Sequence, residues 1–234
     1  MRADAILFDK DGTLFDFAGT WNGWAGGVIE SFAEGDEVLA ARIAAALDYD
    51  LGARSFLPES AVIAGTNREA AEAVAAVLPG RDVEWIEDFM MRQAAEASPA
   101  PATDLVPLLT GLAGGGLRLG VMTNDTEYAA RAHLVAAGIE GHFDFIAGFD
   151  SGHGAKPDAA PLLAFAAAMG LAPGRVVMVG DSLHDLVAGR AAGMQTVAVL
   201  TGMAPASELS PMADVVLPHI GHIPGWLRES VVPA

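Results

Sequence analysis

The feature that most restricts how this chain of 234 residues can fold is a series of six short apolar runs separated by helix-length segments. The runs are AILF (5–8), LRLGVMT (117–123), FDFIAGF (143–149), RVVMVG (175–180), TVAVL (196–200) and DVVL (214–217). Several are apolar at consecutive positions, as parallel strands are when helices cover both faces of their sheet. The segments 126–138, 158–170 and 183–193 have helical length and end in glycine, a frequent helix stop. This alternation predicts an α/β fold with a doubly wound, Rossmann-like parallel sheet.

The interval from Asp16 to about Ala100 breaks the alternation, because it shows helical patterning and no convincing strand. Its helical stretches are WNGWAGGVIESFA, DEVLAARIAAALD, NREAAEAVAAVL and EWIEDFMMRQAAEA. About four helices without a strand between them do not fit a βαβ crossover. SPAPAT (98–103) then marks the return to the α/β pattern. We therefore expect an α/β core over residues 1–15 and 101–234, and a helical cap domain over residues 16–100.

The charge balance argues against two classes of partner. The formal net charge is −17, with 30 acidic residues against 13 lysines and arginines, so the chain repels nucleic-acid backbones and anionic membranes. No apolar stretch approaches the roughly 18 residues of a membrane span, and the first apolar run is too short for a signal peptide. The absence of cysteine excludes disulfides, thiolate metal sites and cysteine nucleophiles. We expect a cytoplasmic protein with a small-molecule partner; these patterns predict no oligomeric state.

Polar side chains follow four of the predicted strands. They are Asp9, Lys10, Asp11 and Thr13; Thr123, Asn124 and Asp125; Lys156; and Asp181 and Asp185. Each alone reads as a helix cap, a turn or a solvated lysine. Ligands of open parallel sheets bind beyond the carboxyl ends of the strands, so we expect these groups to meet at one edge. A site for an anion in so acidic a chain needs a local positive charge, and a divalent cation can supply it.

These segments, in this order, resemble the motifs of the haloacid dehalogenase-like superfamily of phosphohydrolases. DKDGT (9–13) is similar to its first motif, DxDGT; Thr123 to the second; Lys156 to the third; and GDSLHD (180–185) to the acidic fourth. The resemblance covers nearly the whole chain, since the insert lies where phosphoglycolate phosphatase-like members carry a helical cap. The chain departs from the pattern at Lys10, because that position is commonly apolar in these enzymes.

The resemblance implies a phosphatase that acts on a small phosphorylated metabolite, with phosphoglycolate as the first ester to test. Asp9 would be the nucleophile that forms an aspartyl-phosphate. Asp11 would protonate the leaving alcohol and then deprotonate the attacking water. Thr123, the backbone N–H of Asn124 and the ammonium of Lys156 would hold the phosphoryl oxygens.

The resemblance also implies Mg²⁺, a hard cation that prefers oxygen ligands. It assigns to this ion the Asp9 carboxylate, the Asp11 backbone carbonyl and the Asp181 carboxylate. Asp185 would orient Lys156, or a water on the metal, from behind these ligands.

Two alternatives to a phosphatase stay open. One is a non-catalytic phosphate-sensing or regulatory module, because receiver domains also pair a phosphorylatable aspartate with a lysine in a doubly wound sheet. Asp11 argues for catalysis, since a sensor has little need of an acid and base beside the nucleophile. The other is a sugar-phosphate mutase of the same fold. Such mutases commonly use a cap lysine, and residues 16–100 contain no lysine.

Substrate specificity is expected to come from the insert closing over the pocket. Asn67 or Arg68 could reach a carboxylate or hydroxyl of the substrate from the stretch AGTNRE (64–69). Alternatively, Thr66 simply caps the helix that starts at Asn67, with Glu69 near its first turn. Trp21 and Trp24 lie three positions apart and are expected to pack in the interior of the cap.

Overall fold

The computed structural model describes residues 3–58 and 60–228, and its centre is a parallel six-stranded sheet. The strand order is β5-β4-β1-β6-β7-β8. The strands are β1 (Ala5–Phe8), β4 (Arg118–Met122), β5 (Phe145–Ala147), β6 (Val176–Gly180), β7 (Gln195–Val199) and β8 (Val215–Leu217). Each lies within a predicted run or begins one residue before it, so the predicted doubly wound α/β core is confirmed.

Strand β1 lies in the middle of the sheet and is buried at every position. Its Phe8 is aligned with Val121 of β4 and with Val179 of β6. The segments that follow these three strands therefore leave the sheet at the same edge. This register brings residue 9 close to the residues that follow β4 and β6, which are 114 or more positions away in sequence.

Helices cover both faces of the sheet because β1 is apolar on both sides. Ile6 and Phe8 pack against α5 (Leu105–Gly114), α6 (Glu127–Ala136) and α10 (Ile223–Arg228). Ala5 and Leu7 face the opposite layer, which holds α7 (Ala160–Met169) and α8 (Leu183–Ala191). The remaining short elements are α9 (Ala206–Leu209) and the 3₁₀ turns η2 (Glu140–His142), η3 (Pro173–Arg175), η4 (Ser210–Met212) and η5 (Ile220–His222).

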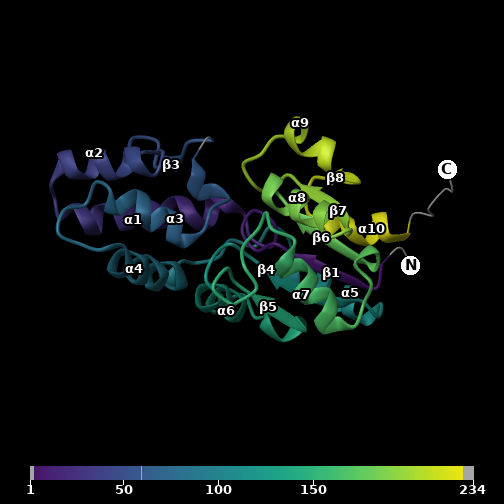
Figure 1. Ribbon diagram of the computed structural model, residues 1–234. Coiled ribbons are helices and arrows are strands. Elements are labelled where there is room, and N and C mark those ends of the chain that lie inside the picture. The colour runs from purple at the N-terminus through teal and green to yellow at the C-terminus, as the bar shows by residue number, and fades with distance from the viewer. Residues whose placement is uncertain (1–2, 59, 229–234) are drawn as a thin grey trace.

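The segment between β1 and α5 forms a second group of helices, at the far end of the molecule in Figure 1. They are α1 (Phe17–Ala33), α2 (Glu37–Ala46), α3 (Asn67–Ala75) and α4 (Val83–Glu96), with the 3₁₀ turn η1 (Ala61–Ile63) before α3. The helices share a buried cluster that includes Ile29, Ile43, Val74 and Met90. The predicted cap boundaries, at residues 16 and 100, stay a proposal.

The expectation of no strand in the insert was wrong. Two-residue strands β2 (Tyr49–Asp50) and β3 (Ser55–Phe56) form an antiparallel hairpin there. The hairpin turn contains Arg54 at φ 53°, and the Asp50 side chain accepts hydrogen bonds from the backbone N–H groups of residues 52 and 53. Strands of two residues are too short to show an alternating pattern. Within the described residues, no helix is both long enough and apolar enough to cross a membrane.

Candidate active site

The turn after β1 is shaped by the close approach of Asp181. Asp9 continues the strand by donating its backbone N–H to the Val179 carbonyl at 2.8 Å. Gly12 then takes a φ of 74°, a conformation that favours glycine, and a Cβ at this position would overlap the Asp181 carboxylate. Thr13 Oγ1 lies 3.4 Å from Asp181 Oδ1. The Gly-Thr pair thus lets the loop after β6 lie directly against the loop after β1.

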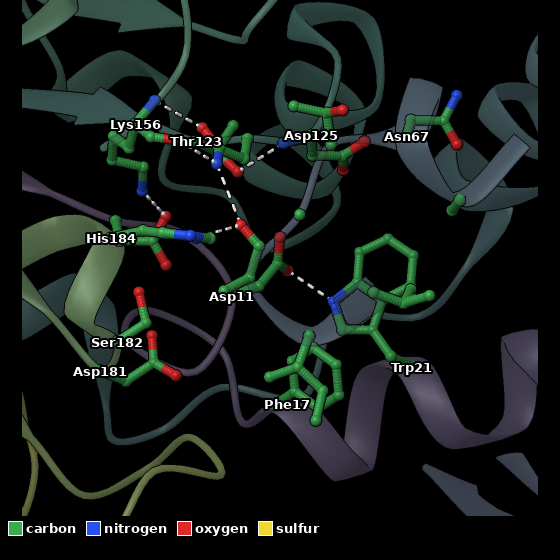
Figure 2. A pocket seen from close by; sticks show the side chains of 18 of the residues that line it. Asp11, Phe17, Trp21, Asn67, Thr123, Asp125, Lys156, Asp181, Ser182 and His184 are labelled. Carbon is green, nitrogen blue, oxygen red and sulfur yellow. Dashed lines mark hydrogen bonds and ion pairs between the residues drawn. The ribbon is translucent and has the colours of Figure 1, made fainter. Parts of the chain in front are cut away.

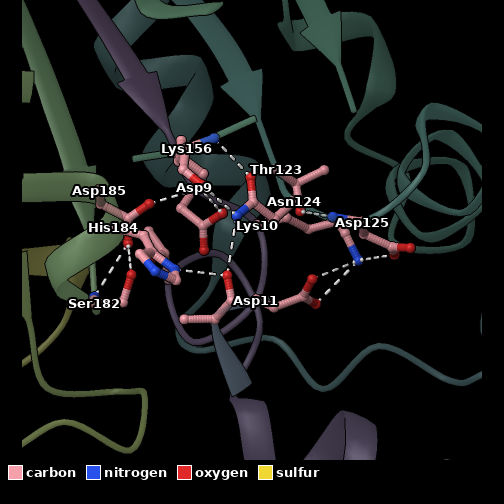
Figure 3. A network of polar contacts seen from close by, with 12 residues as sticks. Asp9, Lys10, Asp11, Thr123, Asn124, Asp125, Lys156, Ser182, His184 and Asp185 are labelled. Atoms are coloured by element: carbon pink, nitrogen blue, oxygen red, sulfur yellow. Dashed lines mark hydrogen bonds and ion pairs between the residues drawn. The ribbon is translucent and has the colours of Figure 1, made fainter. Parts of the chain in front are cut away.

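Lys156 joins two of the predicted acidic residues (Figure 3). Its buried ammonium donates 2.6 Å hydrogen bonds to Asp9 Oδ1 and to Asp185 Oδ1. The other oxygen of Asp185 accepts from the backbone N–H and the hydroxyl of Ser182, at 3.1 and 2.7 Å, and so caps helix α8. Although burial opposes it, the charges of Asp185 and Asp9 raise the pKa of Lys156. The lysine is therefore a permanent cation beside Asp9.

Three buried carboxylates, those of Asp9, Asp181 and Asp185, lie close enough together to share a cation. Each offers an oxygen within 4.8 Å of the others. Burial, with the neighbouring charges of Asp185 and Asp11, raises the pKa of Asp9 to about 7 despite Lys156. Burial and the charges of Asp9 and Asp185 also raise the pKa of Asp181 well above its usual range.

One lysine cannot balance three ionised carboxylates in a buried site, and a divalent cation can. The donors are all hard carboxylate oxygens, the kind that Mg²⁺ prefers. The residues present therefore fit the predicted cofactor. Both oxygens of Asp185 already accept hydrogen bonds from Lys156 and Ser182. Among the residues that the structure describes, Thr13, at 3.4 Å, is the one side-chain hydrogen-bond partner of Asp181. Asp9 and Asp181 are accordingly the better placed carboxylate ligands.

The loop after β4 reaches Lys156 through Asn124. The Asn124 amide bridges the backbone of Lys156, accepting from its N–H and donating to its carbonyl, both at 2.9 Å. Asn124 Nδ2 also donates to the Ala64 carbonyl of the insert at 3.0 Å. Thr123 is buried, and its Oγ1 accepts from the backbone N–H of Asp125 at 3.1 Å. The structure thus brings Thr123, Asn124 and Lys156 to one edge with Asp9, as the strand register requires.

The carboxylate of Asp11 is held by a residue of the insert (Figure 2). Trp21 Nε1, on α1, donates a 2.8 Å hydrogen bond to Asp11 Oδ1. On the other side, the Lys10 ammonium lies 2.9 Å from Asp11 Oδ2 and 2.9 Å from Asp125 Oδ2. The same ammonium lies 5.0 Å from the centre of the Trp21 ring. Asp11 is therefore held at the junction of the sheet and the insert.

Lys10 is completely buried, and His133 of α6 completes its surroundings. The His133 Nε2 lies 2.7 Å from the Ala94 carbonyl, and its Nδ1 lies 3.0 Å from the Lys10 ammonium. A carbonyl only accepts and an ammonium only donates, so the proton is on Nε2 and Nδ1 is the acceptor. Burial and the charge of Lys10 lower the pKa of His133. The ring is neutral, and it links α6 to the end of α4.

This group of Lys10, Asp125, His133 and Trp21 had no counterpart in the sequence prediction. Lys10 was expected at the shared edge of the sheet and noted as a departure from an apolar position, but no partner was predicted for it. His133 lies inside a helical segment among alanines, where a histidine has no distinctive spacing. The signal that could have found the group is Lys10 itself, because an ammonium at a buried position requires acidic or accepting partners.

The two predicted substrate contacts of the insert have different surroundings. Asn67 lines the pocket above the carboxylates, and its Nδ2 donates to the Glu87 carbonyl at 3.1 Å. Arg68 does not line this pocket. Its guanidinium is instead held by Glu72, Glu84 and Glu87, at 2.9–3.3 Å. Thr66 caps α3 in a reciprocal capping box with Glu69, as the alternative interpretation predicted.

The family model for haloacid dehalogenase-like hydrolases matches residues 3–193, which include all four strand-end segments. This chain belongs to that family. The haloacid dehalogenase-like core predicted from the four motifs is thereby confirmed. Relatives named phosphoglycolate phosphatase confirm the subgroup predicted from the position of the helical insert. So is the enzyme class, a phosphatase-type hydrolase.

Relatives of this haloacid dehalogenase-like hydrolase match it over nearly its whole length. A phosphoglycolate phosphatase of Caulobacter vibrioides is 30% identical over 231 residues, covering 96% of this chain and 90% of the relative. A protein named tyrosine-protein kinase PtkA, from Mycobacterium tuberculosis, is 33% identical over 232 residues, covering 97% of this chain and 72% of the relative.

The fold is shared with a crystal structure from Haemophilus somnus, titled a predicted phosphoglycolate phosphatase. The two superpose with a TM-score of 0.74 at 18% identity, over 97% of this chain and 99% of the other. The likeness therefore includes the helices inserted after β1 as well as the sheet.

Proposed function

We propose that this chain is a Mg²⁺-dependent phosphomonoesterase that acts on a small phosphorylated metabolite through an aspartyl-phosphate at Asp9. The observation that carries the proposal is the surroundings of that one carboxylate. Asp9 lies at the end of the central strand, 2.6 Å from the Lys156 ammonium and beside Asp181, with Asp11 two residues further on. A nucleophile, an anion-binding cation and an acid are thus supplied by one edge of the sheet.

In the first half of the reaction, an Asp9 carboxylate oxygen attacks phosphorus. The new O–P bond forms as the bond between phosphorus and the leaving alcohol oxygen breaks, and Asp11 gives its proton to that oxygen. Lys156 and the hydroxyl of Thr123 would donate to the phosphoryl oxygens as charge redistributes. The products of this half are a neutral alcohol and the Asp9 acyl phosphate.

In the second half, the Asp11 carboxylate takes a proton from water, and the water oxygen attacks phosphorus. The Asp9 O–P bond breaks and returns its electron pair to the carboxylate, releasing inorganic phosphate. Asp11 is then protonated and ready for the next ester. Splitting one displacement in two in this way lowers the barrier of each.

Asp9, Asp181 and the backbone carbonyl of Asp11 would hold Mg²⁺, which when bound neutralises charge on the transferring phosphoryl group. In this arrangement Asp185 would act by holding Lys156 in place. The site needs both cations because the chain carries a formal net charge of −17. Phosphoglycolate is the first natural ester to test, because relatives matching over 90% or more of the chain carry that name.

The proposal is tested by measuring phosphate release from p-nitrophenyl phosphate with Mg²⁺ and after EDTA treatment. We expect turnover only with the metal, and at least about a thousandfold loss in Asp9→Asn, since covalent catalysis then fails. The control is Asp158→Asn, the same substitution in the loop after Lys156 at a residue that does not line the pocket. Metal-independent turnover, or an Asp9→Asn variant with full activity, would contradict the proposal.

A further inference from the structure

The pocket above Asp9 is closed on the side of the insert by aromatic and aliphatic side chains. Those lining it are Phe17, Trp21, Trp24, Phe56, Val62, Ile63, Ala70 and Ala94. Phe17 and Phe56 pack at 5.7 Å between ring centres, and Trp21 and Trp24 form an edge-to-face pair at 5.0 Å. The cavity has a volume of about 80 Å³ and opens to solvent. The part of a substrate beyond its phosphoryl group therefore meets an apolar surface.

The insert places no positive charge in this pocket. Of its arginines, none is among the described residues that line it. Arg54 pairs with Glu30, Arg68 with three glutamates and Arg92 with Asp88, while Arg81 lies 4.1 Å from the Trp85 ring centre and Arg42 is exposed. Lys156 is the one lysine lining the pocket, and it is held at Asp9, where the phosphoryl group would bind.

The ionisable groups that line the pocket besides Lys156 are Asp9, Asp11, Asp125, Asp181 and His184. His184 Nδ1 lies 2.8 Å from the Ala64 carbonyl, so in the neutral ring Nδ1 donates and Nε2 is an acceptor. Besides Lys156 and His184, every charged side chain that a second anionic group would face is acidic, and the other polar side chains there, Thr66, Asn67, Asn124 and Ser182 among them, are uncharged. Burying a charge without a partner is costly, so the pocket disfavours such a group.

One donor in this apolar wall lacks a partner. The indole Nε1 of Trp24 is buried and makes no hydrogen bond within the described residues. A buried N–H without an acceptor costs free energy. Because Trp24 also lines the pocket, a ligand oxygen that reached its Nε1 would recover that cost. A carbonyl, ether or hydroxyl oxygen on an otherwise apolar leaving group has the right chemistry to do so.

We infer that this pocket selects phosphomonoesters whose leaving alcohol is uncharged and mainly apolar or aromatic, with one hydrogen-bond acceptor for Trp24. Esters with a second anionic group, phosphoglycolate among them, are disfavoured. This inference rests on the proposed phosphatase function.

A matched pair of esters tests the charge preference on the unmodified enzyme. The phosphate ester of 4-(hydroxymethyl)benzoic acid carries a carboxylate, and the phosphate of its methyl ester carries a neutral carbonyl on the same ring. We measure kcat/KM for both at pH 8 with Mg²⁺, where imidazoles are ordinarily neutral. The methyl ester should be favoured about tenfold or more. Phosphoglycolate and its amide, compared in the same assay, should show the same direction.

The role of the Trp24 N–H is tested with Trp24→Phe, which keeps an aromatic ring and removes the donor. Relative to benzyl phosphate, which lacks the acceptor, kcat/KM for the methyl ester should fall about fivefold to tenfold. Trp85→Phe is the matched control, because Trp85 is partly exposed on α4 and does not line the pocket. Trp85→Phe should leave kcat/KM unchanged for both esters. Thermal melts of both variants establish that they fold.

The outcomes separate a failure of the inferred substrate preference from a failure of the proposed phosphatase function. Equal or higher kcat/KM for the carboxylate ester overturns the inference and leaves the phosphatase proposal standing. If Trp24→Phe leaves kcat/KM for the methyl ester unchanged relative to benzyl phosphate, Trp24 does not bind the acceptor oxygen of the substrate. Failure to release phosphate from any ester, p-nitrophenyl phosphate included, overturns the proposed function and the inference with it.

Discussion

Trp21 of the insert donates a 2.8 Å hydrogen bond from Nε1 to Oδ1 of Asp11, the carboxylate proposed as acid and base. The two residues belong to different parts of the fold, because Asp11 follows the central strand β1 and Trp21 lies in helix α1 of the insert. Lys10 contacts the same carboxylate from the side of the sheet at 2.9 Å. The orientation of Asp11 thus depends on where helix α1 sits.

Replacing Trp21 with phenylalanine should lower kcat about fivefold to tenfold, because it removes a hydrogen bond that orients the acid. The loss should be larger for an alkyl phosphate than for p-nitrophenyl phosphate, whose leaving group has little need of a proton. Steady-state kinetics with both esters measures this, with Trp85→Phe as the control. Equal losses on the two esters would mean that Trp21 acts on binding rather than through Asp11.

Replacing Lys10 with methionine should destabilise the protein by about 3–5 kcal/mol, since it leaves buried acidic partners uncompensated. The ammonium is fully buried between Asp11, Asp125 and His133. Although burial opposes it, Asp11 and Asp125 raise the pKa of Lys10, so the positive charge is present throughout the usual pH range. Urea unfolding followed by circular dichroism gives the free energy. Adding Asp125→Asn should recover part of it, and an additive further loss would argue against the ion pair.

Stability without metal should fall as pH rises from about 4 towards 7. The pKa of Asp9 is raised to about 7 from the ordinary 3.8 by burial and by Asp185 and Asp11. The folded state therefore binds more protons than the unfolded state over this range, and its stabilisation is lost as pH rises through the folded pKa. Asp181 shifts in the same direction.

Magnesium should reverse this loss, because it binds the ionised carboxylates. The gain in Tm on adding Mg²⁺ should accordingly be larger at pH 8 than at pH 5, as measured by differential scanning fluorimetry. Asp181→Asn removes one proposed ligand and should abolish most of the gain at pH 8. A gain that is the same at both pH values, or that survives in Asp181→Asn, would place the metal elsewhere.

Arg68→Ala should leave KM unchanged for acidic and neutral phosphomonoesters alike. The guanidinium is engaged by Glu72, Glu84 and Glu87, and these contacts together raise its pKa further above the ordinary value. Because these pairs are largely exposed, the cost should be only a modest loss of stability. Asn67→Ala, at a neighbouring residue that does line the pocket, is the informative comparison. A rise in KM for acidic esters only, in Arg68→Ala, would restore the original assignment.

The edge that gathers Asp9, Thr123, Lys156 and Asp181 could be predicted because parallel strands share a carboxyl end. Each of these residues follows its strand directly or through a short loop, so strand assignment alone brought them together. The contact of Asp185 with Lys156 also agrees with the sequence hypothesis. Its geometry comes from the capping box of α8, a local feature that sequence can specify.

The partners of Asp11 could not be predicted, because they depend on packing between the insert and the sheet. The sequence predicted that Trp21 packs in the interior of the cap. Its contact with Asp11 forms only when helix α1 packs against the loop after β1. The glutamates that hold Arg68 include Glu84 and Glu87 of α4, and only the packing of α3 against α4 brings them there. The β2–β3 hairpin was not predicted, because strands of two residues are too short to show an alternation of apolar and polar residues.

The central claim is that Asp9 becomes covalently phosphorylated, and it is tested most directly by rapid acid quenching during turnover followed by peptide mass spectrometry. The account predicts a peptide containing Asp9 that carries one phosphoryl group, present only with substrate and Mg²⁺ and lost in Asp9→Asn. An unmodified Asp9 throughout turnover, or the phosphoryl group on another residue, would contradict it.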